Sequence, residues 1–119
     1  MRNPGLLLSD DLLFISKITG TAHSLGLEVK SARTPADALA KAQARPLSCV
    51  LIDLQNPGLD VAAFVKDLSA AGSPYIVAYG SHVDAASLKA ASDAGCHLVL
   101  PRSKFVDQLN TELPKWMGI

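Results

Sequence analysis

The sequence has little of what cross-links a small protein or carries it into a membrane. Neither of its two cysteines, Cys49 and Cys96, has a Cys or His partner at ligand spacing, which argues against a disulfide framework and against a zinc site. No apolar run is long enough to cross a bilayer, and the three leucines of residues 6–8 are too few for the core of a secretory signal. We therefore expect a cytoplasmic protein without a membrane partner.

Net charge is absent as well. The 11 Lys and Arg residues balance the 11 Asp and Glu residues, which gives a formal net charge of zero. Such a chain has no overall field to attract nucleic acid or anionic lipid, so we expect no nucleic-acid partner. What the sequence does have is apolar content, since 49% of its 119 residues are hydrophobic and no linker, repeat or low-complexity stretch interrupts them. The expected organisation is one domain over residues 1–119.

Short apolar runs alternate along the chain with longer amphipathic segments, and each run is closed by polar or turn-forming residues. Strands are predicted at residues 5–9, 27–32, 49–52, 74–79 and 98–100. Helices are predicted at residues 11–25, 35–45, 59–71, 83–94 and from 103 onward. Strands that are apolar on both sides and joined by helical crossovers call for a parallel sheet with helices on both faces. The predicted class is a doubly wound α/β fold.

Two helices carry specific expectations. The first is predicted to place four apolar side chains near one face, namely Leu12, Ile15, Ala22 and Leu25. Pro114 is expected to fray or kink the end of the last helix, because proline cannot donate the backbone hydrogen bond of a helix interior.

Three acidic residues follow the first and third predicted strands directly: Asp10, Asp11 and Asp53. In a doubly wound sheet, functional groups gather beyond the carboxyl ends of the strands, so these carboxylates converge if the two strands are neighbours. Like charges in one cleft need a cation or a proton to offset them, and a set of oxygen ligands suits Mg²⁺. The alternative is that an aspartate here simply caps a helix. Capping explains no more than one member of the doublet.

The pattern resembles the receiver domain of bacterial response regulators over nearly the whole chain. The resemblance rests on Leu-Leu-Leu-Ser-Asp-Asp at 6–11, on Val-Leu-Ile-Asp at 50–53 with Leu-Gln-Asn-Pro-Gly-Leu-Asp after it, and on Ala-Gly at 94–95. It implies a flavodoxin-like five-stranded parallel sheet in the order 2-1-3-4-5. It also implies that Asp53 accepts a phosphoryl group, and that Asp10, Asp11, Asp53 and the backbone carbonyl of Gln55 hold Mg²⁺.

The chain departs from the family at the positions that respond to phosphorylation. The family has a Ser or Thr at the end of strand four; the position falls on Tyr79 or Gly80 here, and only Ser81 next door offers a small hydroxyl. Where the family has Lys after strand five stands Arg102, whose planar guanidinium is not interchangeable with an ammonium group. The switch aromatic of the family falls on Val99. By resemblance, Ser81 and Arg102 are the residues expected to assist Asp53.

The implied function is phosphorelay signalling by a stand-alone receiver-type domain, a switch rather than an enzyme that turns over a metabolite. Its implied partners are a histidine kinase or phosphotransfer protein and a downstream protein target, with a second copy of the chain as a further candidate. The altered switch positions leave an alternative, a pseudo-receiver that binds partners without control by phosphorylation. A flavin carrier is disfavoured, because Asp10 and Asp11 stand where a phosphate-binding loop would be needed.

Overall fold

The computed structural model describes residues 2–119, in which five parallel strands form one sheet in the order β2-β1-β3-β4-β5. The strands are β1 (Gly5–Leu8), β2 (Val29–Ala32), β3 (Cys49–Asp53), β4 (Tyr75–Gly80) and β5 (Leu98–Pro101). The helices between and after them are α1 (Leu12–Ser24), α2 (Pro35–Ala44), α3 (Val61–Ala71), α4 (Ala85–Asp93) and α5 (Arg102–Trp116). The alternation, the parallel sheet and the strand order expected from the sequence are confirmed.

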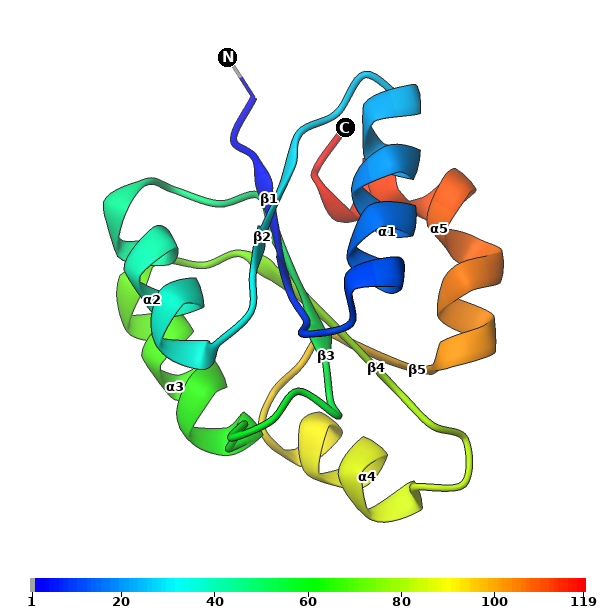
Figure 1. Ribbon diagram of the computed structural model, residues 1–119. Coiled ribbons are helices and arrows are strands. Elements are labelled where there is room, and N and C mark those ends of the chain that lie inside the picture. The colour runs from blue at the N-terminus through cyan, green and yellow to red at the C-terminus, as the bar shows by residue number, and fades with distance from the viewer. Residues whose placement is uncertain (1) are drawn as a thin grey trace.

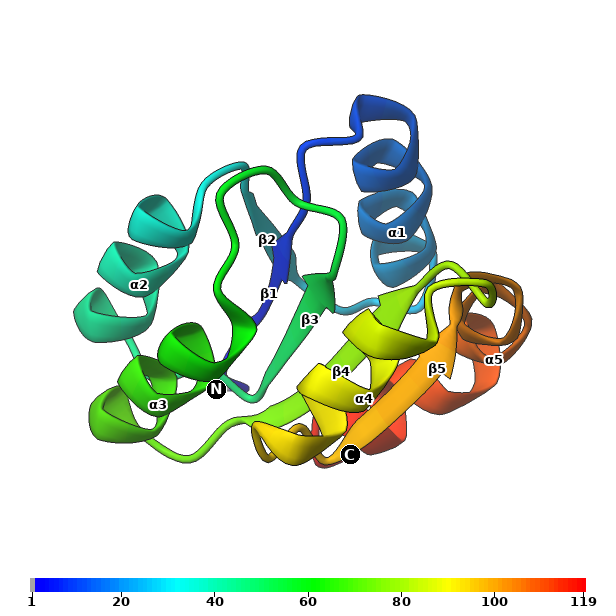
Figure 2. The ribbon, with the colours of Figure 1, turned by 90° about the horizontal axis from the view of Figure 1, so that it is seen from below.

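The sheet is covered on both faces. Helices α1 and α5 lie on one face, and α2, α3 and α4 lie on the other (Figures 1 and 2). Because successive strand residues point to opposite faces, the sheet divides the core in two. Side chains such as Leu7, Leu51 and Tyr79 pack under α1 and α5, whereas Leu6, Ile52 and Ala78 pack under the other three helices. This double burial explains why the central strands read as unbroken apolar runs.

Side-chain caps set where most helices begin. The N-terminal residue before each of four helices is Asp or Thr, and its side chain accepts a backbone N–H from the first turn; these caps are Asp11, Thr34, Asp60 and Asp84. Such caps satisfy N–H groups that have no partner within the helix. They move the start of α3 to Val61 and that of α4 to Ala85, two residues later than predicted.

Two details of the predicted helices are wrong. Leu12 does not face the sheet with Ala22 but is 62% exposed, because it lies in the first turn of α1, directly after the cap and beyond the end of β1. Pro114 does not fray the end of α5, which continues to Trp116 and buries that indole in the core. A proline near a helix end loses only one intrahelical hydrogen bond, and the burial of Trp116 more than offsets it.

No helix within residues 2–119 combines the length and apolar character that crossing a membrane requires.

Candidate functional site

The carboxyl ends of β1 and β3 lie side by side, with Leu8 paired to Ile52 in the sheet. The residues that follow these two strands therefore meet at one edge, which Figure 2 views from below. There they line a cavity of about 300 Å³ whose walls are Asp10, Asp11, Asp53, Gln55, Asn56, Pro57 and Arg102. The three acids therefore lie around one cavity, as the sequence predicted, and Gln55 lies beside them.

Asp53 ends β3 and is only 3% exposed. Its Oδ2 accepts a hydrogen bond of 2.9 Å from the Ser9 hydroxyl, and its Oδ1 accepts one of 3.0 Å from the Gln55 backbone N–H. A buried carboxylate is costly unless hydrogen bonds or charges compensate it. Here two donors fix both oxygens and the orientation of the carboxyl group.

Asp11 is the member of the doublet that caps a helix. Its Oδ1 accepts the Phe14 backbone N–H at 3.1 Å, and its own N–H donates to the Ser9 hydroxyl oxygen at 3.2 Å. Ser9 therefore links Asp11 to Asp53 and is itself fully buried. The capping interpretation holds for Asp11, and it leaves Asp10 without a structural role in the helix.

Asp10 instead pairs with Arg33, which follows β2. The Arg33 Nε and Nη2 atoms lie 3.1 and 3.0 Å from Asp10 Oδ1. The side chains are 58% and 45% exposed, so solvent screens this ion pair. Asp10 can therefore exchange its partner at low cost.

Arg102 lies on the opposite wall of the cavity, at the first position of α5. Its Nη2 is 3.9 Å from Asp53 Oδ1, close enough for charge attraction and too far for a hydrogen bond. Its guanidinium carbon lies 5.0 Å from the centre of the Phe14 ring and 6.0 Å from that of Tyr79. Arg102 thus lies on the same cavity as Asp53, within reach of its negative charge.

The carboxylates of Asp10, Asp11 and Asp53 outnumber the guanidinium groups of Arg33 and Arg102 near them, so one negative charge is left without a cationic partner. The oxygen donors suit Mg²⁺ in kind. Within residues 2–119, however, no three acidic, His or Cys side chains stand close enough to hold an ion among them. Each acid is turned to another partner, Asp10 to Arg33 and Asp11 to the start of α1. The residues fit a magnesium site by type and by shared cavity, but Asp10 and Asp11 would both have to turn from their present partners to hold an ion together with Asp53.

The end of β4 places the three residues among which the sequence resemblance left the hydroxyl position open, Tyr79, Gly80 and Ser81. Tyr79 pairs with Asp53 across the sheet and Gly80 is the last strand residue. A Cβ on Gly80 would lie 3.3 Å from the Leu54 side chain, so the position has no spare room. Ser81 lines a neighbouring cavity of about 430 Å³ together with Gln55, His82, Arg102 and Ser103. Ser81 and Asp53 therefore border different cavities, which share Gln55 and Arg102.

Tyr79 is fully buried, and its hydroxyl has no hydrogen-bond partner among the described residues. Burial raises the pKa of this phenol well above its usual range, and the negative charge of Asp53 raises it further. Its ring stacks on Phe105 with centroids 4.4 Å apart. The tyrosine acts here as a large apolar side chain under the site.

The site contacts of three further residues could not be predicted from the sequence. Ser9 stands directly before the acid doublet, but only the structure shows its hydroxyl between Asp11 and Asp53. Arg33 is 23 residues from Asp10 in the sequence and reaches it because β2 pairs with β1. Phe14 meets Arg102 because α1 packs beside α5.

Several solved structures that share this fold are described as receiver domains. The receiver domain of the sensor histidine kinase PA1611 from Pseudomonas aeruginosa PAO1, with a magnesium ion coordinated in its active-site cleft, is 20% identical; the match covers 100% of both chains with a TM-score of 0.83. The receiver domain of NtrX from Brucella abortus is 19% identical, with 96% of this chain and 98% of that chain covered and a TM-score of 0.82.

A third match is a response regulator protein from Burkholderia pseudomallei with a phosphorylated aspartic acid, a calcium ion and citrate. It is 16% identical, with 98% of this chain and 71% of that chain covered and a TM-score of 0.76. No protein-family model and no curated protein matches the sequence. Identities this low establish the fold, and the chain has the flavodoxin-like fold of receiver domains.

Proposed function

We propose that this chain is a receiver-type domain of phosphorelay signalling in which Asp53 accepts a phosphoryl group. The observation that carries the proposal is the placement of Asp53. Its carboxylate is held by two hydrogen bonds in the wall of a cavity that also exposes Asp10, Asp11 and a guanidinium group. A buried carboxylate such as that of Asp53 is rarely kept for stability alone, because its desolvation is costly.

The proposed step is the transfer of a phosphoryl group from a phosphohistidine. A carboxylate oxygen of Asp53 forms the new P–O bond as the P–N bond breaks, and the donor imidazole keeps the electron pair and takes up a proton. Ser9 and the Gln55 N–H hold the carboxylate in one orientation, which lowers the entropic barrier to attack. Arg102 opposes the negative charge that gathers beside it.

Asp10, Asp11, Asp53 and the Gln55 carbonyl are the groups proposed to hold Mg²⁺. When bound, the ion would screen the charge of the acids and of the incoming phosphoryl group. Of the four groups, Asp10 is the one whose carboxylate has to leave a charged partner, Arg33.

The proposed partners are a histidine kinase or phosphotransfer protein as donor and a further protein as target, and the proposed location is cytoplasmic. The output step does not use a strand-four hydroxyl in the family's manner, because Gly80 ends the strand and packs against Leu54. A homodimer is a further proposed assembly. Size-exclusion chromatography before and after phosphorylation tests it, and an unchanged monomer in both states would contradict it.

Phosphoryl acceptance is tested with acetyl phosphate and Mg²⁺, read by intact mass. We expect one phosphoryl adduct on the wild type and none on Asp53→Asn. The matched control is Asp60→Asn, which makes the same change at an exposed cap outside the cavity and should keep the adduct. Absence of an adduct on the wild type, or its survival in Asp53→Asn, would overturn the proposal and favour a binding module that is independent of phosphorylation.

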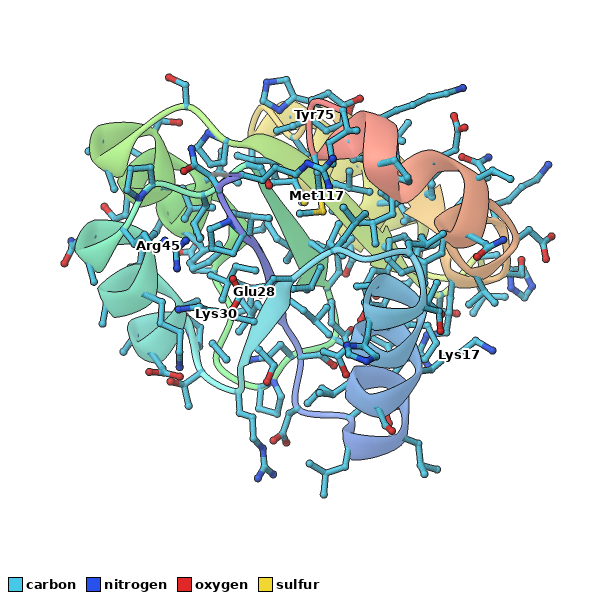
Figure 3. All side chains as sticks on the ribbon, turned by 90° about the horizontal axis from the view of Figure 1, so that it is seen from above. Lys17, Glu28, Lys30, Arg45, Tyr75 and Met117 are labelled. Atoms are coloured by element: carbon cyan, nitrogen blue, oxygen red, sulfur yellow. The ribbon has the colours of Figure 1, made fainter. Side chains whose placement is uncertain are left out.

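The role of Asp10 is tested through Arg33. Because Arg33 competes with the metal for Asp10, we expect Arg33→Gln to tighten Mg²⁺ binding about two- to fivefold, the range for an exposed ion pair. The control is Arg45→Gln, which removes the same charge beside α2, across the molecule from Lys17 on α1 (Figure 3). Isothermal titration calorimetry measures both affinities. Equal affinities for the two variants would show that Arg33 does not compete.

A further inference from the structure

Arg102 is held beside Asp53 by ring faces rather than by hydrogen bonds. Within residues 2–119 its guanidinium donates no hydrogen bond, and its approach to Asp53 stops at 3.9 Å. The side chain is 38% exposed, so neither burial nor close packing on all sides confines it. What it does contact are the faces of Phe14 at 5.0 Å and Tyr79 at 6.0 Å.

A guanidinium within about 6 Å of an aromatic ring face is attracted by the ring quadrupole. The side chain of arginine is also long and flexible, so a partner that restricts it reduces the entropy lost when it engages an anion. The two rings therefore select, among the many rotamers of Arg102, those that keep its charge over the cavity.

The two rings are themselves fixed by parts of the site. Phe14 donates its backbone N–H to the Asp11 carboxylate, which places it in the first turn of α1. Tyr79 is paired with Asp53 in the sheet and lies 5.2 Å from the Phe14 ring, centre to centre. Phe14 is the half-buried member of the pair and the closer one to Arg102.

We infer that Phe14 is a positioning residue of the candidate phosphoryl site, acting through Arg102. Its ring faces Arg102 and holds the guanidinium where the charge on a modified Asp53 would develop. This inference rests on the proposed function of Asp53. It also explains how an arginine can stand where a lysine is expected, since an ammonium group lacks the planar face that stacks on a ring.

The first test is structural and uses the metal-free protein. Ring currents from Phe14 should shift the Arg102 side-chain resonances in NMR spectra. Phe14→Leu should abolish the shift, and Phe14→Tyr should retain it. Tyr75→Leu is the control, because it removes a half-buried ring at the far end of β4 (Figure 3). Arg102 resonances that are indifferent to Phe14→Leu would overturn the inference.

The second test is a double-mutant cycle on the affinity for beryllofluoride in the presence of Mg²⁺. We expect Phe14→Leu to weaken binding about fivefold, the effect of one cation–π contact, and Phe14→Tyr to restore it. In the Arg102→Gln background, Phe14→Leu should have no further effect. An equal loss in both backgrounds would show that Phe14 acts on stability alone and would overturn the inference.

Failure of the proposed function of Asp53 can be distinguished from failure of the inference about Phe14. If the wild type binds no beryllofluoride and takes no phosphoryl group, the proposed function fails, while the NMR shifts still decide whether Phe14 positions Arg102. Should Phe14→Leu not fold, Phe14→Met serves as the second variant, because methionine is flexible and of similar volume but has no ring. It should lose the ring-current shift in the same way, and a retained shift would contradict the inference.

Discussion

The two faces of the sheet are built from different side chains. Five of the six aromatic residues lie on the face covered by α1 and α5, and only Phe64 lies on the other. The second face is rich in alanine instead, and its buried members include Ala32, Ala38 and Ala91. We call the face under α1 and α5 the aromatic face and the face under α2, α3 and α4 the alanine face. Large rings fill one layer, while small side chains let three helices approach the other closely.

This difference matters for the candidate site, because the site contacts large side chains on one face of the sheet and a glycine on the other. On the aromatic face, Arg102 contacts Phe14 and Tyr79, and Tyr79 stacks in turn on Phe105. On the alanine face, the site ends at Gly80, which has no side chain to move. Packed rings transmit a displacement to their neighbours because close-packed interiors resist compression. Through these rings, α1 and α5 are the helices that are packed against the surroundings of Asp53.

The largest change in the free energy of unfolding is expected from two separate variants, each of which removes one aromatic ring from one face of the sheet. Phe105→Ala should lower the free energy of unfolding by about 3–5 kcal/mol, the usual cost of such a cavity. Phe105 also stacks between Tyr79 and Trp116, at 4.4 and 5.7 Å. Aromatic pairs add about 0.5–1.5 kcal/mol each to area burial. Urea denaturation should therefore show Phe105→Ala to be the more damaging of the two variants.

Phe64→Ala is the matched variant on the alanine face. Phe64 is 3% exposed, and no ring of the described residues stacks on it. The stability lost in Phe64→Ala should be smaller than that lost in Phe105→Ala by about 1–3 kcal/mol, the contribution of the two stacked rings that Phe64 lacks. Equal losses would mean that the aromatic stack contributes only by its buried area.

The sequence was sufficient for the fold because the apolar strands and capped helices agree with one another along the whole chain. It was also sufficient to predict that Asp10, Asp11 and Asp53 lie around one cavity, since the ends of neighbouring parallel strands meet at one edge. It was insufficient for Arg33 and Phe14. Their contacts depend on which strands and helices become neighbours in the fold. The sequence around an exposed Arg or a half-buried Phe looks the same whether or not that residue contacts the site.

The two cysteines report separately on the two faces of the sheet. Cys49 is buried on the face covered by α1 and α5, and Cys96 packs at the margin of the face covered by α2, α3 and α4. Burial raises the pKa of the Cys96 thiol to about 11 and that of Cys49 to about 12. Since the thiolate is the reactive form, Cys96 should be alkylated near pH 8 about a hundredfold more slowly than an ordinary thiol. Its rate should rise about tenfold per pH unit up to its pKa.

Cys49 is fully buried and should react only when the protein unfolds. Iodoacetamide labelling of Cys96→Ser, which leaves Cys49 alone, should therefore follow the unfolding equilibrium as urea is added. Labelling of Cys49→Ser should proceed in the folded state. Fast reaction of Cys49 without denaturant would reveal that the aromatic face opens locally.

A smaller and opposite effect is expected from Tyr79→Phe. The Tyr79 hydroxyl is buried without a hydrogen-bond partner among residues 2–119, and a buried unpaired polar group destabilises the folded state. Removing it should raise the free energy of unfolding by about 1 kcal/mol. Tyr75→Phe makes the same change on the half-buried tyrosine of the same strand and should leave stability unchanged. A destabilised Tyr79→Phe would show that the hydroxyl has a partner in solution.

The smallest effect is expected on the alanine face, at the cap of α4. This helix fully buries only Ala91, so its first turn depends on Asp84, whose two carboxylate oxygens accept the Ser87 N–H and hydroxyl at 3.1 and 2.7 Å. The Ser87 hydroxyl, followed by its N–H, lowers the pKa of Asp84. A lowered carboxyl pKa stabilises the helix at all pH values above the ordinary carboxyl range, and the stabilisation is lost as pH falls through the lowered value. Backbone chemical shifts of α4 should therefore move toward unfolded values on acidification. In Asp84→Asn, which caps without titrating, they should stay constant at the same pH values, and a parallel shift in both proteins would assign the acid response to another group.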